Sequence, residues 1–386
     1  MALHFERAEY LTRMEKARTK LRERGLGALL IFAQESHYYL TGFDTSGFVF
    51  FQCAVLTADD RPITLLTRLP DREQATRTSI IEDIRIWYDA EGVDPTRDLK
   101  SILAEQGLQG ARIGVELNTF GLTGLNHDRV QRQLAGWCTL EDASNLVREL
   151  RVTKSPAEIA YVRQAAALAD HALEAMLTAI RPGAFEGDIA AAGVSAILKG
   201  GGDMPPSGPV LGSGDRALLV RSSTGARHLD PIDQITMEFA GSYRHYCACL
   251  MRTAAVGKAD PRQRQMFDAT RDALAAMTEA ARPGRPIGEI DDAHRRVFDA
   301  AGFGSTRLAA CGYSLGASFR PSWMDVPPMI YSGNPLLAQP GMVLFLHAIL
   351  VDAPRNLAMS LGHTILITET GSEALSRLTP EYSVCI

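Results

Sequence analysis

The stretch ALEAMLTAIRPG at residues 172–183 decides the fold, because it returns 101 residues later as ALAAMTEAARPG at residues 273–284. Both copies are followed, at the same spacing, by a glycine and an isoleucine: Gly187 and Ile189, then Gly288 and Ile290. Each copy predicts a helix, a tight Arg-Pro-Gly turn and a second helix. Two copies are too few for an open solenoid, so the repeat predicts a closed domain with pseudo-two-fold symmetry.

Strand-like runs follow each copy of the repeat. They are Ile235–Ala240 and Tyr243–Thr253 after the first copy, and Met342–Leu350 and Thr364–Thr368 after the second. Two such sets, each with helices to cover one face, predict a curved antiparallel sheet with helices on its outside. We expect the functional groups where the two halves meet, because pockets are common there.

The first 150 residues have a different pattern, in which apolar runs alternate with helical periodicity. The strand-like runs are residues 28–33, 48–56, 63–67, 84–88 and 113–116, and helical patterns cover residues 96–106 and 125–134. This alternation predicts an α/β domain. Near Lys154 the segment SPAE begins a helix, with Ser155 as N-cap and Glu158 completing a capping box. We therefore expect an N-terminal domain at residues 1–150 and a second domain at residues 155–386.

The composition excludes several classes of protein. The 386 residues hold 40 Lys and Arg against 45 Asp and Glu, a net charge of −5, so nothing favours binding to nucleic acid. No run of about 18 apolar residues predicts a membrane span. The charged N-terminus lacks an apolar signal segment, and the six Cys form no CxxC pair. We expect a cytoplasmic protein.

Several short motifs, in order along the chain, resemble those of a known superfamily. They are YYLTGF (38–43), KSPAEI (154–159), the two RPG turns, GYSLG (312–316) and TILITETG (364–371). Together they resemble the pita-bread superfamily of methionine aminopeptidases, proline-specific peptidases, creatinase and ectoine hydrolase. The resemblance implies an α+β fold, with a pita-bread C-terminal domain of duplicated αβ halves and a smaller creatinase-like α/β domain before it. Within the superfamily, residues 238–253 and 312–323 most resemble ectoine hydrolase.

The metallopeptidases of this superfamily hold two divalent cations with two Asp, one His and two Glu. The resemblance places those five positions on Glu238, Cys249, Tyr313, His347 and Gly362. Only Glu238 keeps a carboxylate, so the oxygen-rich set that two hard cations need is missing. We expect no metal and no other cofactor. A single zinc ion held by Glu238, Cys249, His347 or His363 stays open as an alternative.

Three side chains are the candidate catalytic residues. Glu238 lies in an apolar strand, where loss of solvation raises a carboxyl pKa and suits acid–base chemistry. His347, at the pseudo-symmetric position, is expected to titrate near neutral pH and to shuttle a proton. Tyr313 is expected to donate a hydrogen bond to a developing oxyanion. The alternatives are structural: a carboxylate paired with Arg252 or Arg244, a core histidine and a buried tyrosine.

Five further side chains are candidates for binding a small-molecule substrate. His363 is expected at the edge of the pocket and Cys249 in its wall. Arg221, Arg252 and Arg320 are expected to bind a substrate carboxylate through their guanidinium groups. The resemblance also implies a homodimer, in which Arg68 and Arg72 of one subunit reach the pocket of the other.

These inferences predict a metal-independent hydrolase of an amide- or amidine-type C–N bond in a small polar solute that carries a carboxylate, similar to ectoine hydrolase or creatinase. Three alternatives stay open. They are a mononuclear zinc hydrolase, a peptidase-like enzyme acting on Xaa-Pro substrates, and an inactive homologue that binds a ligand or partner.

Overall fold

The computed structural model describes residues 3–222 and 224–386. The chain divides into two compact units, one ending at Arg151 and the other beginning at Val152. Among the described residues, no helix combines the length and apolar character needed to cross a membrane.

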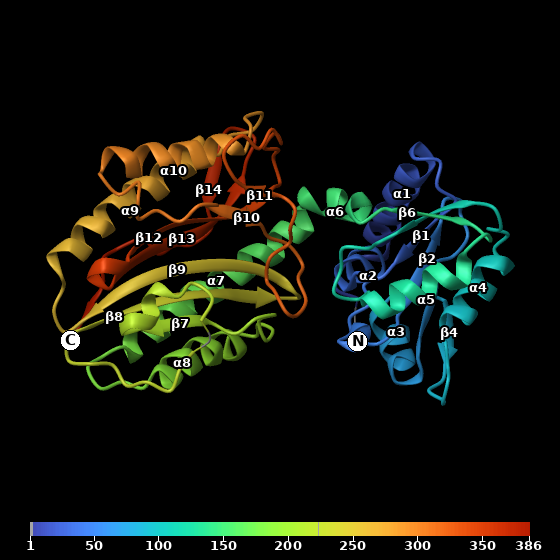
Figure 1. The fold of residues 1–386 in the computed structure, drawn as a ribbon, viewed down its shortest axis with the longest axis horizontal. Helices are drawn as coiled ribbons and strands as arrows, with labels where there is room; N and C mark the ends of the chain where they lie inside the picture. Colours follow the sequence, from blue (N-terminus) through green and yellow to red (C-terminus); the bar gives the residue numbers. More distant parts are fainter. Residues whose placement is uncertain (1–2, 223) are drawn as a thin grey trace. The chain divides into compact units, whose positions relative to one another are not determined.

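The first unit is built on a six-stranded sheet in the order β4-β3-β2-β1-β5-β6 (Figure 1). Its strands are β1 (Ala28–Ile31), β2 (Cys53–Thr57), β3 (Thr64–Arg68), β4 (Asp83–Trp87), β5 (Arg112–Val115) and β6 (Thr139–Asp142). Its helices are α1 (Arg7–Glu23), α2 (Gln34–Thr41), α3 (Arg72–Thr78), α4 (Thr96–Glu105), α5 (Gly124–Leu134) and α6 (Asn145–Val152). The sheet is mixed, because β2 pairs antiparallel with both of its neighbours while the other pairs are parallel.

One predicted strand of this unit is shorter than the sequence indicates. The apolar run 48–56 was expected to be extended throughout, but Gly47–Val49 forms a 3₁₀ turn and β2 begins only at Cys53. The turn is fixed locally: the Gly47 N–H donates to the Thr45 hydroxyl at 2.8 Å, and that hydroxyl donates to Asp71 at 2.7 Å. Side-chain hydrogen bonds to nearby backbone compete with strand pairing at such positions.

The second unit contains a nine-stranded sheet, whose main path runs β11-β10-β12-β13-β9-β8-β7. Its strands are β7 (Val210–Ser213), β8 (Asp233–Tyr243), β9 (Tyr246–Val256), β10 (Gly312–Ser314), β11 (Met329–Ile330), β12 (Val343–Asp352), β13 (Leu357–Ile367), β14 (Ser372–Ala374) and β15 (Val384–Cys385). Its long helices are α7 (Pro156–Ala179), α8 (Glu186–Lys199), α9 (Pro261–Ala280) and α10 (Gly288–Ala300). Figure 1 shows the long strands β8, β9, β12 and β13 curving together, with α7 and α8 along one half and α9 and α10 along the other.

The two halves of this unit repeat each other in detail, as the sequence predicts. The RPG turns end α7 and α9, and both of their glycines, Gly183 and Gly284, have φ of 78°. The Gly183 N–H donates to the Leu229 carbonyl at 2.9 Å, and the Gly284 N–H donates to the Ala338 carbonyl at 2.8 Å. A positive φ is open to glycine at little cost, which explains why the motif ends in glycine in both copies.

Each helix pair covers the outer face of its half of the sheet with its own apolar core. One core joins α7 and α8 to β8 and β9, and includes Leu173, Met176, Met237 and Leu250. The other joins α9 and α10 to β12 and β13, and includes Leu274, Ile290 and Leu346. Because side chains alternate along a strand, the residues between these core positions face the opposite, concave side of the sheet.

Candidate active site

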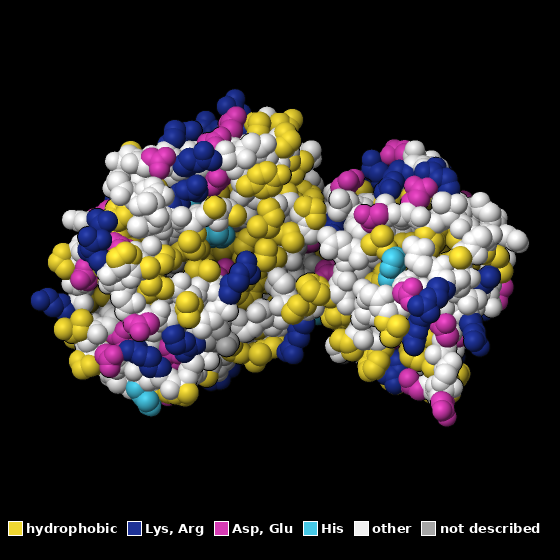
Figure 2. All heavy atoms as spheres, in the orientation of Figure 1, with side chains coloured by type: hydrophobic (Ala, Val, Ile, Leu, Met, Phe, Trp, Pro, Cys, Tyr) yellow, Lys and Arg dark blue, Asp and Glu magenta, His cyan; other side chains and the backbone are white. Residues whose placement is uncertain are grey.

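A cavity of about 410 Å³ opens on the concave face of the second unit. Its walls are Ser207, Val210, Val220, Arg221, Glu238, Met251, Leu308, Ala309, Ala310, Tyr313, Pro321, Ser322, Trp323, Met324, Met329, His347 and Ile349. Figure 2 shows hydrophobic side chains gathered around a hollow in the visible face of this unit. The three candidate catalytic residues, Glu238, Tyr313 and His347, all line this one cavity.

Strand register explains why Glu238 and His347 face the same cavity from different halves of the repeat. Glu238 on β8 lies opposite Met251 on β9, Met251 lies opposite Gly362 on β13, and Gly362 lies opposite His347 on β12. The four residues therefore form one continuous row across the middle of the sheet. Residues in such a row point to the same face, and neighbouring strands are about 4.8 Å apart. The acid and the imidazole thus stand at the two ends of the row.

Gly362 matters in this row because its neighbour Phe345 fills the space beside it. A Cβ atom on Gly362 would lie 2.8 Å from the Phe345 ring carbon Cζ and 2.9 Å from the Leu346 carbonyl oxygen. Such distances are too short for real contacts, so no larger side chain fits here without movement of the ring and the strand. The Phe345 ring in turn packs against the rings of Tyr313 and His347, with centroids 5.4 and 5.5 Å apart.

Burial changes the acid–base behaviour of Glu238. It raises the pKa of the carboxyl to about 7, against the smaller opposing effects of the hydrogen bond from Tyr313 and the positive charge of Arg221. The Tyr313 hydroxyl donates to Oε1 of Glu238 at 3.2 Å. A carboxyl group with a pKa near 7 exists in both protonation states at neutral pH, which suits general acid–base chemistry.

His347 differs from the expectation that it titrates near neutral pH. Burial, with a smaller contribution from His294, lowers the pKa of His347 to about 4. Apolar surroundings disfavour the imidazolium form, and among the residues that the structure describes no carboxylate pairs with the ring to oppose this effect. His347 therefore presents a neutral imidazole at pH 7, with one nitrogen as hydrogen-bond donor and the other as acceptor.

Tyr313 is held between two partners. Its oxygen accepts a hydrogen bond from the indole N–H of Trp323 at 2.8 Å, while its own hydroxyl donates to Glu238. Burial raises the pKa of Tyr313 well above its usual value, so the phenol stays protonated. Its single proton is directed at Glu238, and this differs from the expected free donor for an oxyanion. The sequence alone assigned no role to Trp323, which is the last residue of the 312–323 segment.

Two of the expected substrate-binding residues, Arg252 and His363, lie on the opposite face of the sheet, and their expected place at the pocket is wrong. They alternate with the row residues Met251 and Gly362, so their side chains face the helices. Arg252 donates to the carbonyls of Met251 and Gly362 at 2.9 and 2.8 Å. His363 pairs through Nε2 with the Thr278 hydroxyl at 2.9 Å and lines a separate cavity of about 620 Å³ beside α9.

Of the other three candidates for substrate binding, only Arg221 lines the cavity. Arg221 lines the cavity and is exposed at its rim. Arg320 is also exposed, but only its neighbour Pro321 is among the lining residues. Cys249 is fully buried beneath the concave face and does not reach the cavity surface. Burial raises the pKa of the Cys249 thiol well above its usual value, so the group is a poor nucleophile.

The five residues that the resemblance assigns to metal positions do not fit a pair of divalent cations. The Tyr313 hydroxyl is already bonded to Trp323 and Glu238, Cys249 does not line the cavity, and Gly362 offers no side chain. Glu238 is the one carboxylate of the five positions, and His347 the one imidazole. A two-cation site needs several anionic oxygen ligands to offset four positive charges, and this set supplies one. Of the four possible donors of a single zinc ion, His363 faces the helices instead of the cavity, so at most three lie on the concave side.

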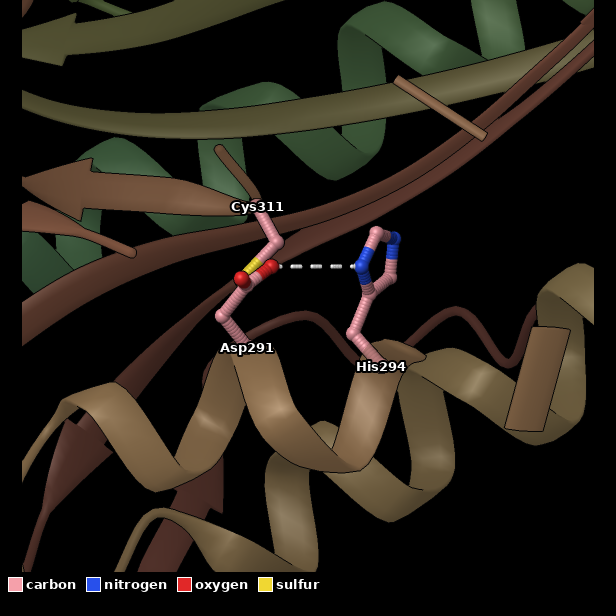
Figure 3. A group of neighbouring side chains, drawn as sticks. All are labelled: Asp291, His294 and Cys311. Carbon is pink, nitrogen blue, oxygen red and sulfur yellow. Dashed lines mark ion pairs between the residues drawn. The ribbon is translucent and has the colours of Figure 1, made fainter. Parts of the chain in front are cut away.

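In the described part of the chain, one cluster has the spacing of a metal site, and it lies outside the cavity. Asp291, His294 and Cys311 are all buried, with ligand atoms within 4.8 Å of one another (Figure 3). The Arg307 guanidinium already donates to Asp291 at 3.2 Å and contacts His294 Nδ1 at 3.1 Å. Although burial opposes it, the hydrogen bond with His294 and the charge of Arg307 lower the pKa of Asp291 to about 2. The cluster is thus a buried ion pair whose cation is Arg307.

Known proteins are similar to this chain in both sequence and fold. The model of metallopeptidase family M24 matches residues 160–369, and that of the creatinase/prolidase N-terminal domain matches residues 13–153. The chain is 28% identical over 397 residues to ectoine hydrolase from Halomonas elongata, covering 97% of each protein. It is 25% identical over 237 residues to an Xaa-Pro dipeptidase from Pyrococcus furiosus, covering 61% of this chain and 66% of that protein.

The likeness extends to solved structures. A dipeptidase from Pyrococcus horikoshii superimposes with a TM-score of 0.84 at 23% identity, covering 96% of this chain and 99% of the other. This likeness confirms the α+β pita-bread fold with its creatinase-like N-terminal domain. Because the M24 model matches more than half of its length, the chain belongs to metallopeptidase family M24, a family of hydrolytic enzymes.

Proposed function

We propose that this protein hydrolyses an amide- or amidine-type C–N bond in a small polar solute that carries a carboxylate, and does so without a metal ion. The observation that supports this most is the row across the sheet, which brings Glu238 and the neutral His347 to one cavity. The similarity to ectoine hydrolase over almost the whole chain supports the same class of reaction.

The cavity fits a small substrate better than a peptide chain. Its volume of about 410 Å³ is at the lower end of the range for small-molecule sites. Arg221 at the rim supplies a positive charge, and a guanidinium group binds a carboxylate in a bidentate manner. Inside the cavity, Glu238, Tyr313 and His347 offer hydrogen-bond donors and acceptors with little net charge. The lining therefore favours an anionic group at the entrance and a polar, neutral group inside.

In the proposed reaction, Glu238 moves the proton. Its carboxylate accepts a proton from water as the water oxygen bonds to the carbon of the C–N bond. The same carboxyl then donates that proton to the nitrogen as the C–N bond breaks, so one water is consumed and an amine is released. His347 orients the water or the reacting carbonyl through hydrogen bonds as a neutral imidazole. A pKa near 4 makes it a weak base, so Glu238 carries the acid–base step.

We prefer this reaction to that of a metallopeptidase because the five positions discussed above supply only one carboxylate for a pair of divalent cations. The second candidate is a binding protein without activity. It is favoured by the absence of a carboxylate at four of the five positions, which carry Cys249, Tyr313, His347 and Gly362. The two proposals differ in one measurable respect, because a binding protein saturates with a ligand that it leaves unchanged.

The test is turnover of ectoines, guanidino acids and Xaa-Pro dipeptides by protein prepared with a chelator, with released amine followed by mass spectrometry. We expect cleavage of a carboxylate-bearing cyclic amidine or guanidino compound. Glu238→Gln should reduce kcat at least 100-fold, whereas Arg221→Gln should mainly raise KM. Glu279→Gln, an exposed carboxyl on α9, is the matched control. Activity that appears only with added divalent cations, or survives in Glu238→Gln, would contradict the proposal.

A further inference from the structure

A chain of two hydrogen bonds runs from a loop tryptophan to the candidate acid. The Trp323 indole N–H donates to the Tyr313 oxygen at 2.8 Å, and the Tyr313 hydroxyl donates to Oε1 of Glu238 at 3.2 Å. All three residues line the cavity, and the exposed fractions of Trp323 and Tyr313 are 6% and 5%. The shorter of the two bonds is the one that involves Trp323.

Trp323 decides which way the Tyr313 hydroxyl points. An indole N–H can only donate, so the phenol oxygen must act as acceptor toward it. The phenol has one proton, and with its oxygen accepting from the indole that proton is donated to Glu238. Without the indole N–H, the hydroxyl could rotate and donate elsewhere in the cavity.

This arrangement distinguishes the two oxygens of Glu238. Oε1 is occupied as the acceptor from Tyr313, while no protein hydrogen bond to Oε2 is found among residues 3–222 and 224–386. When the carboxyl is protonated, Oε1 retains its carbonyl character because it accepts a hydrogen bond, and the proton is carried by Oε2.

We propose that Trp323 is a positioning residue that orients the Tyr313 hydroxyl toward Oε1 of Glu238, so that Oε2 carries the exchangeable proton into the cavity. The backbone of Trp323 is itself fixed by a hydrogen bond, because the Ser318 hydroxyl donates to its carbonyl oxygen at 3.0 Å. Only the catalytic consequence of this inference rests on the proposed function. The orientation of the hydroxyl is a property of the free protein.

The test measures the titration of Glu238 in the free protein, so it needs no substrate. The infrared band of the protonated carboxyl is assigned by its loss in Glu238→Gln, and its pKa is compared in the wild type, Trp323→Phe, Tyr313→Phe and the double variant. Loss of a hydrogen bond to the carboxylate raises the pKa, so we expect a rise of about 1 unit in Tyr313→Phe and about 0.5 unit in Trp323→Phe. In the double variant, Trp323→Phe should add nothing, because it acts through Tyr313.

A variant with the same shape guards against a simple packing effect. Benzothienylalanine placed at position 323 keeps the two fused rings but replaces the N–H by sulfur, and it should shift the pKa as Trp323→Phe does. If either replacement leaves the titration of Glu238 unchanged, or if the effects of Trp323→Phe and Tyr313→Phe add, the proposal is wrong. Failure to find a substrate would count against the proposed hydrolase and would leave this titration result standing.

Discussion

Glu238 and His347 both lose solvation on folding, and this loss moves their pKa values in opposite directions. Burial favours the neutral form of each group, so the carboxyl pKa rises to about 7 and the imidazole pKa falls to about 4. The order of the two values is therefore the reverse of that in water. The sequence predicts the rise for Glu238 from its apolar strand, but it does not show how far burial lowers the pKa of His347.

Glu238 should make the folded protein less stable as the pH rises. The folded state keeps a proton that the unfolded state has lost between about pH 4.5 and pH 7, so the contribution is full below pH 4.5 and is lost as the pH rises through 7. Glu238→Gln removes this effect. Its free energy of unfolding relative to the wild type should increase by about 3 kcal/mol between pH 4.5 and pH 8.

Urea denaturation at a series of pH values measures this difference. Glu279→Gln on the exposed surface of α9 is the control, and its difference from the wild type should stay constant across the same range. A flat difference for Glu238→Gln would show that the carboxyl is solvated in the folded protein.

The strands set which residues reach the cavity. The sequence predicts β8, β9, β12 and β13, and the alternation along each strand, but it does not give the register between β9 and β13. That register places Met251 opposite Gly362, and with it Glu238 and His347 in one row. Arg252 and His363 each lie one residue beyond a member of this row, so alternation along β9 and β13 turns their side chains to the helices.

Gly362 is a position in the row where an added side chain would meet close neighbours. A methyl group there meets the Phe345 ring and a backbone carbonyl below 3 Å, so Gly362→Ala should lower the free energy of unfolding by about 1–3 kcal/mol. The matched control is Gly371→Ala, because a Cβ at Gly371 would have no atom within 4 Å. Chemical denaturation of both variants measures the effect. Equal stability of the two would mean that Phe345 moves aside freely.

The duplicated architecture of the second unit is the part of the molecule that the sequence predicts best. Two matched RPG turns were enough to indicate two halves, and both glycines adopt the same φ. The chemistry is harder to predict, because a fold does not fix the reaction that its site performs. The site depends on three-dimensional contacts between distant residues, such as the hydrogen bond between Trp323 and Tyr313.

The protein as a whole should contain no tightly bound metal. We expect far less than one equivalent of zinc, manganese or cobalt per chain after purification without chelator, measured by plasma mass spectrometry. Added Mn²⁺ should leave the melting temperature unchanged, because a ligand stabilises a protein only when it binds the folded state. One or two equivalents of a copurifying metal, released by chelator with a drop in melting temperature, would contradict the expectation.

The Phe345 ring beside Gly362 also limits which substitutions this chain can accept at position 362. A mutation that introduced a glutamate at position 362 would bring its side chain against the aromatic ring and destabilise the sheet. A carboxylate at this point of the row would therefore require the ring and the glycine to change together. Because either change alone gives a less stable protein, we expect the two residues to be kept or replaced as a pair.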